Sequence, residues 1–156
     1  MPQVFREFFD PVGFENFVPD GMRPVPKLLG NFTFKMYKGK MDKLPLAYRA
    51  LADKMNEIHP EQKFNTAFIQ KYKSGERVYK HRDPMNNLNH TLIAIFGQFS
   101  GAETTIYLDG LTKKIQLNSG DVLSLECTID GIQGPMHEVS PVTQGTRYAF
   151  ILNTIH

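Results

Sequence analysis

Short apolar runs separated by glycine-containing turns fill the chain from residue 64 to residue 153. The turns carry dipeptides such as Ser74-Gly75, Asp109-Gly110 and Ser119-Gly120, which favour tight reversals of the backbone. Regular short strands joined in this way are typical of a β-sandwich or barrel. We therefore predict a jelly-roll core over residues 64–153. Its expected strands are residues 64–72, 78–83, 91–96, 104–108, 114–117, 122–126 and 147–153.

One amphipathic helix is predicted ahead of this core, over residues 44–58. Its apolar residues recur at three- and four-residue steps and form one stripe. Residues 1–43 are rich in proline and glycine, which predicts an irregular segment ending in an aromatic arm. The expected architecture is a single domain, residues 1–156, mainly β with one N-terminal helix (α+β). The helical stripe consists of Leu44, Ala47, Tyr48, Leu51, Met55 and Ile58.

Composition excludes several classes of protein. Hydrophobic residues make up 41% and charged residues 22% of the chain, which is ordinary for a globular domain. No apolar stretch is long enough to span a membrane, and the acidic N-terminus is unlike a signal peptide, so we expect a cytoplasmic protein. The single cysteine, Cys127, predicts a reducing compartment and excludes a cysteine-based zinc site.

Charge is distributed unevenly along the chain. Residues Met22 to Arg82 hold 14 Lys and Arg against 5 Asp and Glu, whereas the rest holds 4 against 11. A basic face would suit an anionic partner such as nucleic acid. The alternative is a solvated lysine-rich helix with its flanking loops, and charge alone favours that alternative.

Two histidines and an aspartate have the spacing of a metal site. His81 and Asp83 are two residues apart in or beside a strand, so their side chains can project from one face. His137 follows 54 residues later, just before the last strand. Two histidines and one carboxylate on one face of an octahedral ion are the ligands of non-haem Fe(II) oxygenases. Zinc prefers four ligands, and the chain offers no cysteine pair and no third matched histidine.

Arg147 and Tyr72 are candidates for binding an anion near that site. Arg147 lies in the apolar strand RYAFILN, and a cation fixed in such a strand calls for a buried anion. A planar guanidinium matches a carboxylate with two hydrogen bonds. Tyr72, nine residues before His81, can offer its hydroxyl to the same carboxylate.

Together, His81-x-Asp83, His137 and Arg147 resemble the iron(II)- and 2-oxoglutarate-dependent dioxygenase superfamily. The resemblance implies a double-stranded β-helix of the jelly-roll, cupin-like type. It also implies Fe(II) bound by the two histidines and Asp83, and 2-oxoglutarate held by Arg147 with the assistance of Tyr72. The expected reaction uses O₂, decarboxylates 2-oxoglutarate to succinate and hydroxylates a C–H bond at the metal, with no separate acid or base.

Two branches of the superfamily contribute to the resemblance. The segment FNTAFIQKYKSGERVYKHRD is similar to the AlkB-like branch, whereas residues 137–149 are more similar to the prolyl hydroxylases. AlkB-like repair enzymes usually carry an acidic residue near the damaged base where this chain has Met85. They also usually carry a second arginine where this chain has Asn153.

The sequence favours a nucleobase in DNA or RNA as substrate. The basic stretch and the AlkB-like front half support this hypothesis, and aromatic side chains of the arm can stack on a base. The alternative is hydroxylation of a peptide side chain such as proline, and a more distant one is a non-catalytic jelly-roll binding module. The candidates for substrate contact are Phe32, Phe34, Tyr37 and Met85.

Overall fold

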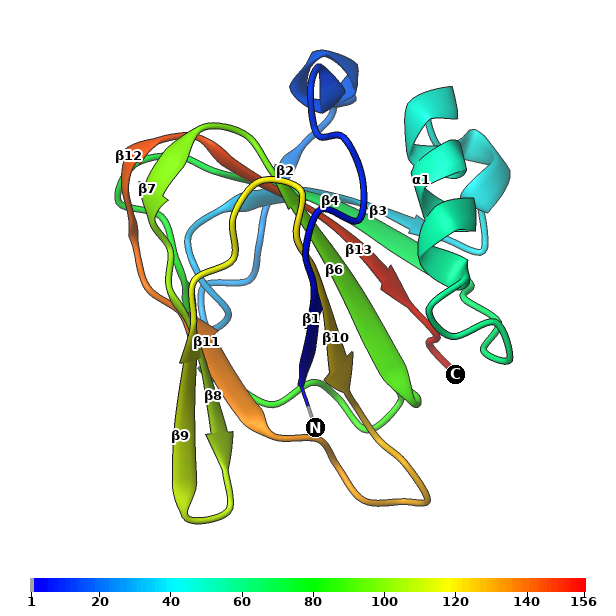
Figure 1. The fold of residues 1–156 in the computed structure, drawn as a ribbon, viewed down its shortest axis with the longest axis vertical. Coiled ribbons are helices and arrows are strands. Elements are labelled where there is room, and N and C mark those ends of the chain that lie inside the picture. The colour runs from blue at the N-terminus through cyan, green and yellow to red at the C-terminus, as the bar shows by residue number, and fades with distance from the viewer. Residues whose placement is uncertain (1) are drawn as a thin grey trace.

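The fold is an antiparallel β-sandwich (Figure 1). The structure is a computed structural model, and it describes residues 2–156. The larger layer, here called the major sheet, has seven strands, and its central strand β13 pairs with β4 and β6 along its length. In spatial order the strands are β1 (Gln3–Phe5), β10 (Val122–Glu126), β6 (His90–Phe96), β13 (Arg147–Asn153), β4 (Thr66–Tyr72), β3 (Thr33–Lys38) and β2 (Arg23–Pro24).

A four-stranded minor sheet lies on the left of Figure 1 and forms the other layer. One hydrophobic cluster fills the space between the layers, with Tyr72, Ile95, Ile106 and Leu123 among its members. Alternate residues of each strand point into this cluster, which is why a period-two pattern of apolar residues in the sequence predicts the strands. The minor sheet orders β5 (Val78–His81), β11 (Met136–Val139), β8 (Thr104–Leu108) and β9 (Leu111–Ile115), and β12 (Val142–Gly145) pairs with β7 (Phe99–Gly101) beside it.

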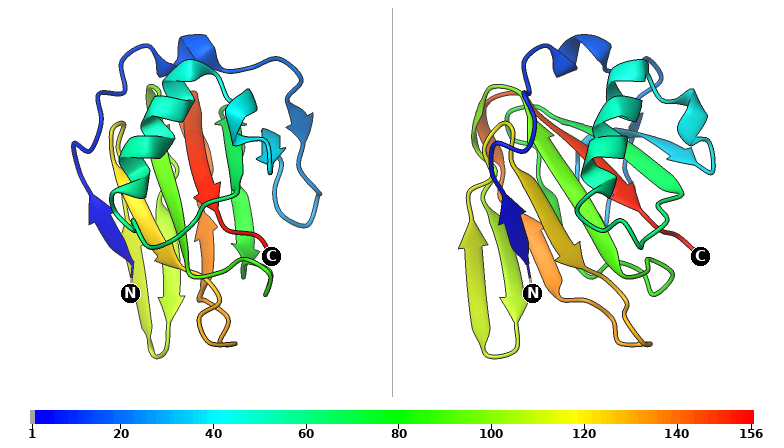
Figure 2. Two further views of the ribbon diagram at one scale, coloured as in Figure 1. Left: turned by 90° about the vertical axis from the view of Figure 1, so that its right-hand side faces the viewer. Right: turned by 45° about the vertical axis from the view of Figure 1, so that its right-hand side comes forward.

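Helix α1 (Leu46–Asn56) covers the outer face of the major sheet (Figure 2). Its buried residues, Tyr48, Leu51 and Met55, follow the three- and four-residue spacing of the predicted stripe. They pack against residues of the central strands such as Phe150. Each fully buried side chain of this size contributes about 1.5–3 kcal/mol. This packing explains why the helix forms although it has no side-chain cap at its N-terminus.

The predicted mainly-β jelly roll with one helix is confirmed, with differences in detail. The helix is two residues shorter at each end than predicted, and β5 ends at His81 rather than at Asp83. The N-terminal segment is not wholly irregular, because β1 adds an edge strand beside β10 and two 3₁₀ helices, at Phe14–Phe17 and Met41–Lys43, interrupt it. Strands β7, β11 and β12 were not predicted. Across residues 2–156, no helix is both long and apolar enough to cross a membrane.

Candidate functional site

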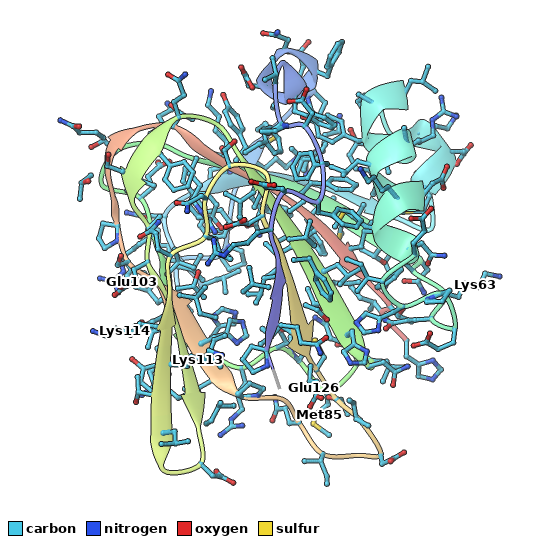
Figure 3. All side chains as sticks on the ribbon, viewed as in Figure 1. Lys63, Met85, Glu103, Lys113, Lys114 and Glu126 are labelled. Carbon is cyan, nitrogen blue, oxygen red and sulfur yellow. The ribbon has the colours of Figure 1, made fainter. Side chains whose placement is uncertain are left out.

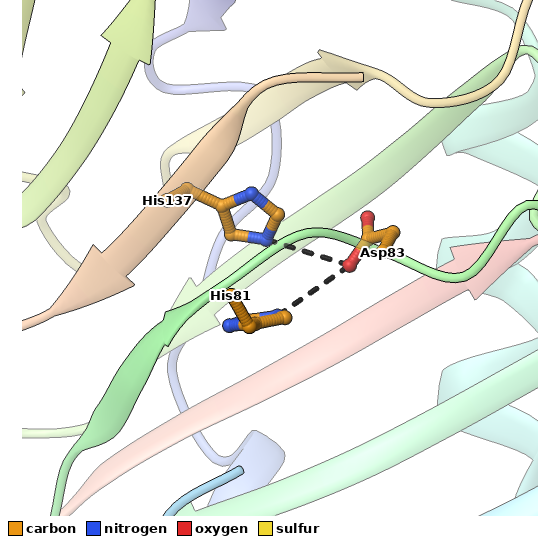
Figure 4. Close-up of side chains that lie close together, drawn as sticks. All are labelled: His81, Asp83 and His137. Carbon is orange, nitrogen blue, oxygen red and sulfur yellow. Dashed lines mark ion pairs between the residues drawn. The ribbon is translucent and has the colours of Figure 1, made fainter. Parts of the chain in front are cut away.

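Three side chains from neighbouring segments converge at one end of the minor sheet. His81 ends β5 and lies directly opposite His137 of β11 in the strand register, so both imidazoles leave the same face. Asp83 follows two residues after His81. Its Oδ1 lies 3.5 Å from His81 Nε2 and 3.4 Å from His137 Nε2 (Figure 4). The structure therefore brings together the three residues that the sequence predicted as metal ligands.

The backbone fixes the orientation of both imidazoles. Nδ1 of His81 lies 2.8 Å from the carbonyl oxygen of Tyr79, and Nδ1 of His137 lies 3.0 Å from that of Pro135. A carbonyl only accepts hydrogen bonds, so each Nδ1 carries a proton and donates it. In the neutral ring this leaves Nε2 with a lone pair for a metal, and such a second hydrogen bond is usual for metal-ligating histidines.

The electrostatics of the site favour a bound cation. Burial alone would raise the pKa of Asp83, but hydrogen bonds and charge from His137 and His81 lower the pKa well below its ordinary value. Burial alone would lower the pKa of His137, but the Asp83 carboxylate raises it. The carboxylate is therefore ionised, and its negative charge beside the two Nε2 atoms suits a bound cation.

Within residues 2–156, this is the one cluster of three or more metal-ligating side chains whose donor atoms lie within 4.8 Å of one another. Its donors, two imidazole nitrogens and one carboxylate oxygen, suit a first-row metal such as Fe(II) and leave coordination positions open. Of the remaining histidines, His59 and His90 stack on each other with ring centroids 3.8 Å apart, and His59 contacts the hydroxyl of Ser124. That pair has a packing role.

Arg147 and Tyr72 form a second feature on the inner face of the major sheet. The guanidinium carbon of Arg147 lies 4.8 Å from the ring centroid of Tyr72, and both residues are only 2% exposed. Phe32 also stacks on the tyrosine, at a centroid distance of 4.3 Å. Gln70, two residues before Tyr72, accepts a hydrogen bond from the tyrosine hydroxyl.

Arg147 has the unsatisfied bonding that an anion site requires. Its Nε is buried and has no hydrogen-bond partner among the described residues, which also offer it no carboxylate within ion-pair distance. Burial lowers the pKa of Arg147, but a guanidinium starts so basic that it stays charged. Burial raises the pKa of Tyr72 to about 12, so the tyrosine stays neutral. The guanidinium shares a side-chain hydrogen bond with Tyr72, but Nε stays unpaired. A buried unsatisfied donor on a cation is costly, and a carboxylate such as that of 2-oxoglutarate would satisfy it.

Asp83 has further partners that the sequence did not indicate. The thiol of Cys127 lies 3.3 Å from Asp83 Oδ2, and Thr91 Oγ1 lies 2.9 Å from the same sulfur. The side-chain amide of Gln133 donates to the backbone carbonyl of Asp83 at 2.7 Å. Burial raises the pKa of Cys127 to about 12, with a further contribution from the Asp83 charge. The signal for Cys127 was its place in the alternation Leu123, Leu125, Cys127, which points into the sandwich.

Two of the four candidates for substrate contact prove to be core residues. Phe32 is 1% exposed beneath Tyr72, and Tyr37 is 7% exposed in the cluster on the helix side of the major sheet. Neither can stack on an extended substrate, which corrects that prediction. Phe34 is half-buried, and Met85 is 49% exposed near the end of β10 in Figure 3.

Comparisons with known proteins identify the fold. No family model matches the chain, and no curated protein matches its sequence. Solved structures do match. A 2OG-Fe(II) oxygenase family oxidoreductase from Burkholderia pseudomallei has a TM-score of 0.72 at 13% identity, covering 97% of this chain and 84% of its own. The viral collagen prolyl hydroxylase of Paramecium bursaria Chlorella virus-1, a 2OG complex, has a TM-score of 0.70 at 15% identity, covering 97% and 94%.

A third similar structure is a Trichoplax adhaerens prolyl hydroxylase in complex with a peptide of hypoxia inducible factor. It has a TM-score of 0.72 at 10% identity and covers 99% of this chain and 83% of its own. The chain thus has the jelly-roll fold of the 2OG-Fe(II) oxygenases. The similarity extends over nearly the whole chain, the N-terminal segment included.

Proposed function

We propose that the protein is an Fe(II)- and 2-oxoglutarate-dependent dioxygenase that hydroxylates a peptide side chain. The observation that carries the proposal is the coexistence of two features inside one sandwich. One is the triad of His81, Asp83 and His137, and the other is the buried Arg147 with an unpaired Nε. A jelly roll that served only as a binding module would have no use for both.

Each residue has a defined part in this proposal. His81 and His137 would present Nε2, and Asp83 would present Oδ1, on one side of the ion. Arg147 would bind the distal carboxylate of 2-oxoglutarate, while Tyr72 packs against the guanidinium and offers its hydroxyl. Bound iron would supply O₂ activation coupled to decarboxylation of 2-oxoglutarate. The apolar residues between the sheets would keep water away from this chemistry.

A peptide substrate fits the structure better than the nucleobase favoured by the sequence. The aromatic arm does not provide a stacking platform, because Phe32 and Tyr37 are buried. Two of the similar structures described above are prolyl hydroxylases, and one of them holds a peptide. The C-terminal motif from His137 to Arg147 resembles the same branch.

An apolar strip on the inner face of the major sheet supports this choice. Ile151 is four residues after Arg147 and pairs with Phe68, four residues before Tyr72, so all four lie on one face. Phe68 in turn pairs with Met36, which is 47% exposed. An extended peptide with an apolar side chain can cover such a strip. The strip, completed by Phe34, is thus Phe34, Met36, Phe68 and Ile151.

The proposal is tested by succinate formation from the purified protein with Fe(II), 2-oxoglutarate and O₂. A library of proline-containing peptides is compared with single-stranded DNA and RNA oligonucleotides, and a mass increase of one oxygen identifies the product. We expect peptides to stimulate turnover and oligonucleotides not to do so. His137→Ala is the inactive control, and His90→Ala, which alters a histidine outside the triad, is the matched active control.

Three outcomes would overturn parts of this proposal. Stimulation by oligonucleotides alone, with salt-sensitive binding, would restore the nucleobase hypothesis. Stimulation by neither class would contradict a peptide substrate while leaving the metal site intact. If the wild-type protein bound neither metal nor 2-oxoglutarate, the non-catalytic binding module would be favoured.

A further inference from the structure

Asp83 uses its two carboxylate oxygens for different purposes. Oδ1 faces both histidines, at 3.4 and 3.5 Å, whereas Oδ2 faces the sulfur of Cys127 at 3.3 Å. Cys127 is 3% exposed, so solvent does not compete for this contact. The oxygen that does not face the metal position is therefore held by the thiol of Cys127, the residue that follows β10 of the major sheet.

Counting protons gives the direction of the hydrogen bonds. A thiol has one proton, and an ionised carboxylate only accepts, so the S–H of Cys127 donates to Asp83 Oδ2. The hydroxyl of Thr91, 2.9 Å from the sulfur, must then donate to it. Thr91 is 5% exposed, and the relay from hydroxyl to thiol to carboxylate is enclosed in the sandwich.

The backbone of Asp83 is held independently of its side chain. Gln133 donates to the Asp83 carbonyl oxygen at 2.7 Å, which restrains the segment beyond the end of β5. Asp83 is thus held both at its backbone carbonyl and at its carboxylate, although it lies outside a strand. Three ligand atoms on one side of an octahedral ion leave three positions, and a second oxygen from Asp83 would occupy one of them.

We propose, on the basis of the function proposed above, that Cys127 is a positioning residue that keeps Asp83 a one-oxygen ligand. The thiol does not bind the metal. It directs Oδ1 toward the ion and occupies Oδ2, so that the open positions remain available to the co-substrates. Partners of this kind typically change metal affinity by 10- to 100-fold.

The test measures metal affinity rather than turnover. Co(II) is titrated anaerobically into the full-length protein and followed by its visible absorption, with and without 2-oxoglutarate. We expect Cys127→Val, which fills the space without a donor, to weaken Co(II) binding about tenfold. Cys127→Ser keeps a donor and should stay within about threefold of wild type. Leu125→Val, a change in β10 two residues before Cys127, should leave the affinity unaltered.

Thr91→Val provides a second variant in case Cys127→Val does not fold. It keeps the sulfur but removes the hydroxyl that orients the thiol proton, so a smaller loss of affinity is expected. Equal Co(II) affinity in wild type, Cys127→Val and Thr91→Val would overturn the inference and leave the proposed function standing. A sulfur-to-cobalt charge-transfer band in wild type would also overturn it, by showing the thiolate as a ligand. No Co(II) binding by wild type would overturn both proposals.

Discussion

Arg147 and Tyr72 are direct partners in the pairing of β13 with β4, so the guanidinium and the phenol ring stand on adjacent positions of one sheet face. β13 and β4 are interior strands of the major sheet, flanked by β6 and β3. The positive charge is consequently held on a rigid support, with no side-chain partner for its Nε among the described residues. A preorganised cation of this kind favours a carboxylate ligand, because little ordering remains to be done on binding.

Replacing the cation should weaken co-substrate binding strongly without unfolding the protein. We expect Arg147→Met to weaken 2-oxoglutarate binding about 10- to 150-fold, since a hydrogen bond to a charged group contributes about 1.5–3 kcal/mol. Its stability should be equal or higher, because a buried charge is replaced by an apolar side chain of similar length. Isothermal titration of the Co(II)-loaded protein and urea unfolding measure the two effects. Unchanged 2-oxoglutarate affinity would contradict the assignment of Arg147.

Tyr72→Phe should have a smaller effect on the same titration. The ring that packs on Arg147 and Phe32 is kept, and only the hydroxyl is lost. We expect a loss of about 2- to 12-fold in 2-oxoglutarate affinity, corresponding to one neutral hydrogen bond of about 0.5–1.5 kcal/mol. A loss of 2-oxoglutarate affinity as large as that of Arg147→Met would contradict an assisting role, and would make the Tyr72 hydroxyl a principal contact of the co-substrate.

Metal should stabilise the folded protein through the triad alone. Free Co(II) at one hundred times its dissociation constant should raise the free energy of unfolding by about 2.7 kcal/mol, since the unfolded chain has no assembled site. The gain should vanish on adding a chelator and in Asp83→Ala, while His59→Ala should retain it. Thermal unfolding with and without metal measures this. Equal stabilisation of Asp83→Ala would place the metal elsewhere.

The apolar strip should affect the peptide and not the co-substrate. We expect Met36→Glu to raise the KM for a peptide substrate at least fivefold. The variant places a charge where the peptide would cover an apolar side chain, which costs about 1–2 kcal/mol of binding free energy. The affinity for 2-oxoglutarate should be unchanged. Leu46→Glu, which alters a side chain 73% exposed on α1, is the matched control. Equal peptide kinetics for both variants would show that the substrate does not contact Met36.

Stability should fall as the solution becomes alkaline. The pKa values of Tyr72 and Cys127 are raised by burial to about 12, and that of Tyr48 is also raised. Above pH 9–10 the unfolded chain loses these protons while the folded chain keeps them, so rising pH favours unfolding. Each group contributes up to about 1.4 kcal/mol per pH unit within its window.

Urea unfolding at pH 8, 9, 10 and 11 measures this decline. Tyr48→Phe should be less stable than wild type at pH 8 by about 1 kcal/mol, because the hydroxyl that donates to the Phe14 carbonyl is lost. Between pH 10 and 11 its stability should fall less steeply than that of wild type. Parallel curves for the two proteins would show that Tyr48 does not titrate with unfolding.

Local patterns were sufficient for much of the architecture. The predicted strands at 104–108, 122–126 and 147–153 coincide with β8, β10 and β13, because alternation of side chains is a property of neighbouring residues. The stripe of Tyr48, Leu51 and Met55 specified the buried face of α1 for the same reason. The order His81-x-Asp83, His137 also sufficed to nominate the three residues that the structure brings together.

Other features depend on which segments meet across the fold. β1 is short and its pattern is uninformative, and it becomes a strand only because β10 accepts it along an open edge. The burial of Phe32 and Tyr37 on opposite faces of the major sheet likewise could not be predicted from the sequence. An aromatic residue on a strand can pack in a core or contact a ligand equally well.

The contact between Cys127 and Asp83 shows the distinction most clearly. The residues are 44 positions apart and lie just beyond the ends of β5 and β10, strands of different sheets, so no spacing rule links them. Their approach follows from the register that pairs β10 with β6 and from the path of the chain beyond β5, which face each other across the sandwich. Residue type and period therefore determined which side chains are available, and sheet pairing decided which of them act together, because non-local contacts are set by the packing of whole sheets.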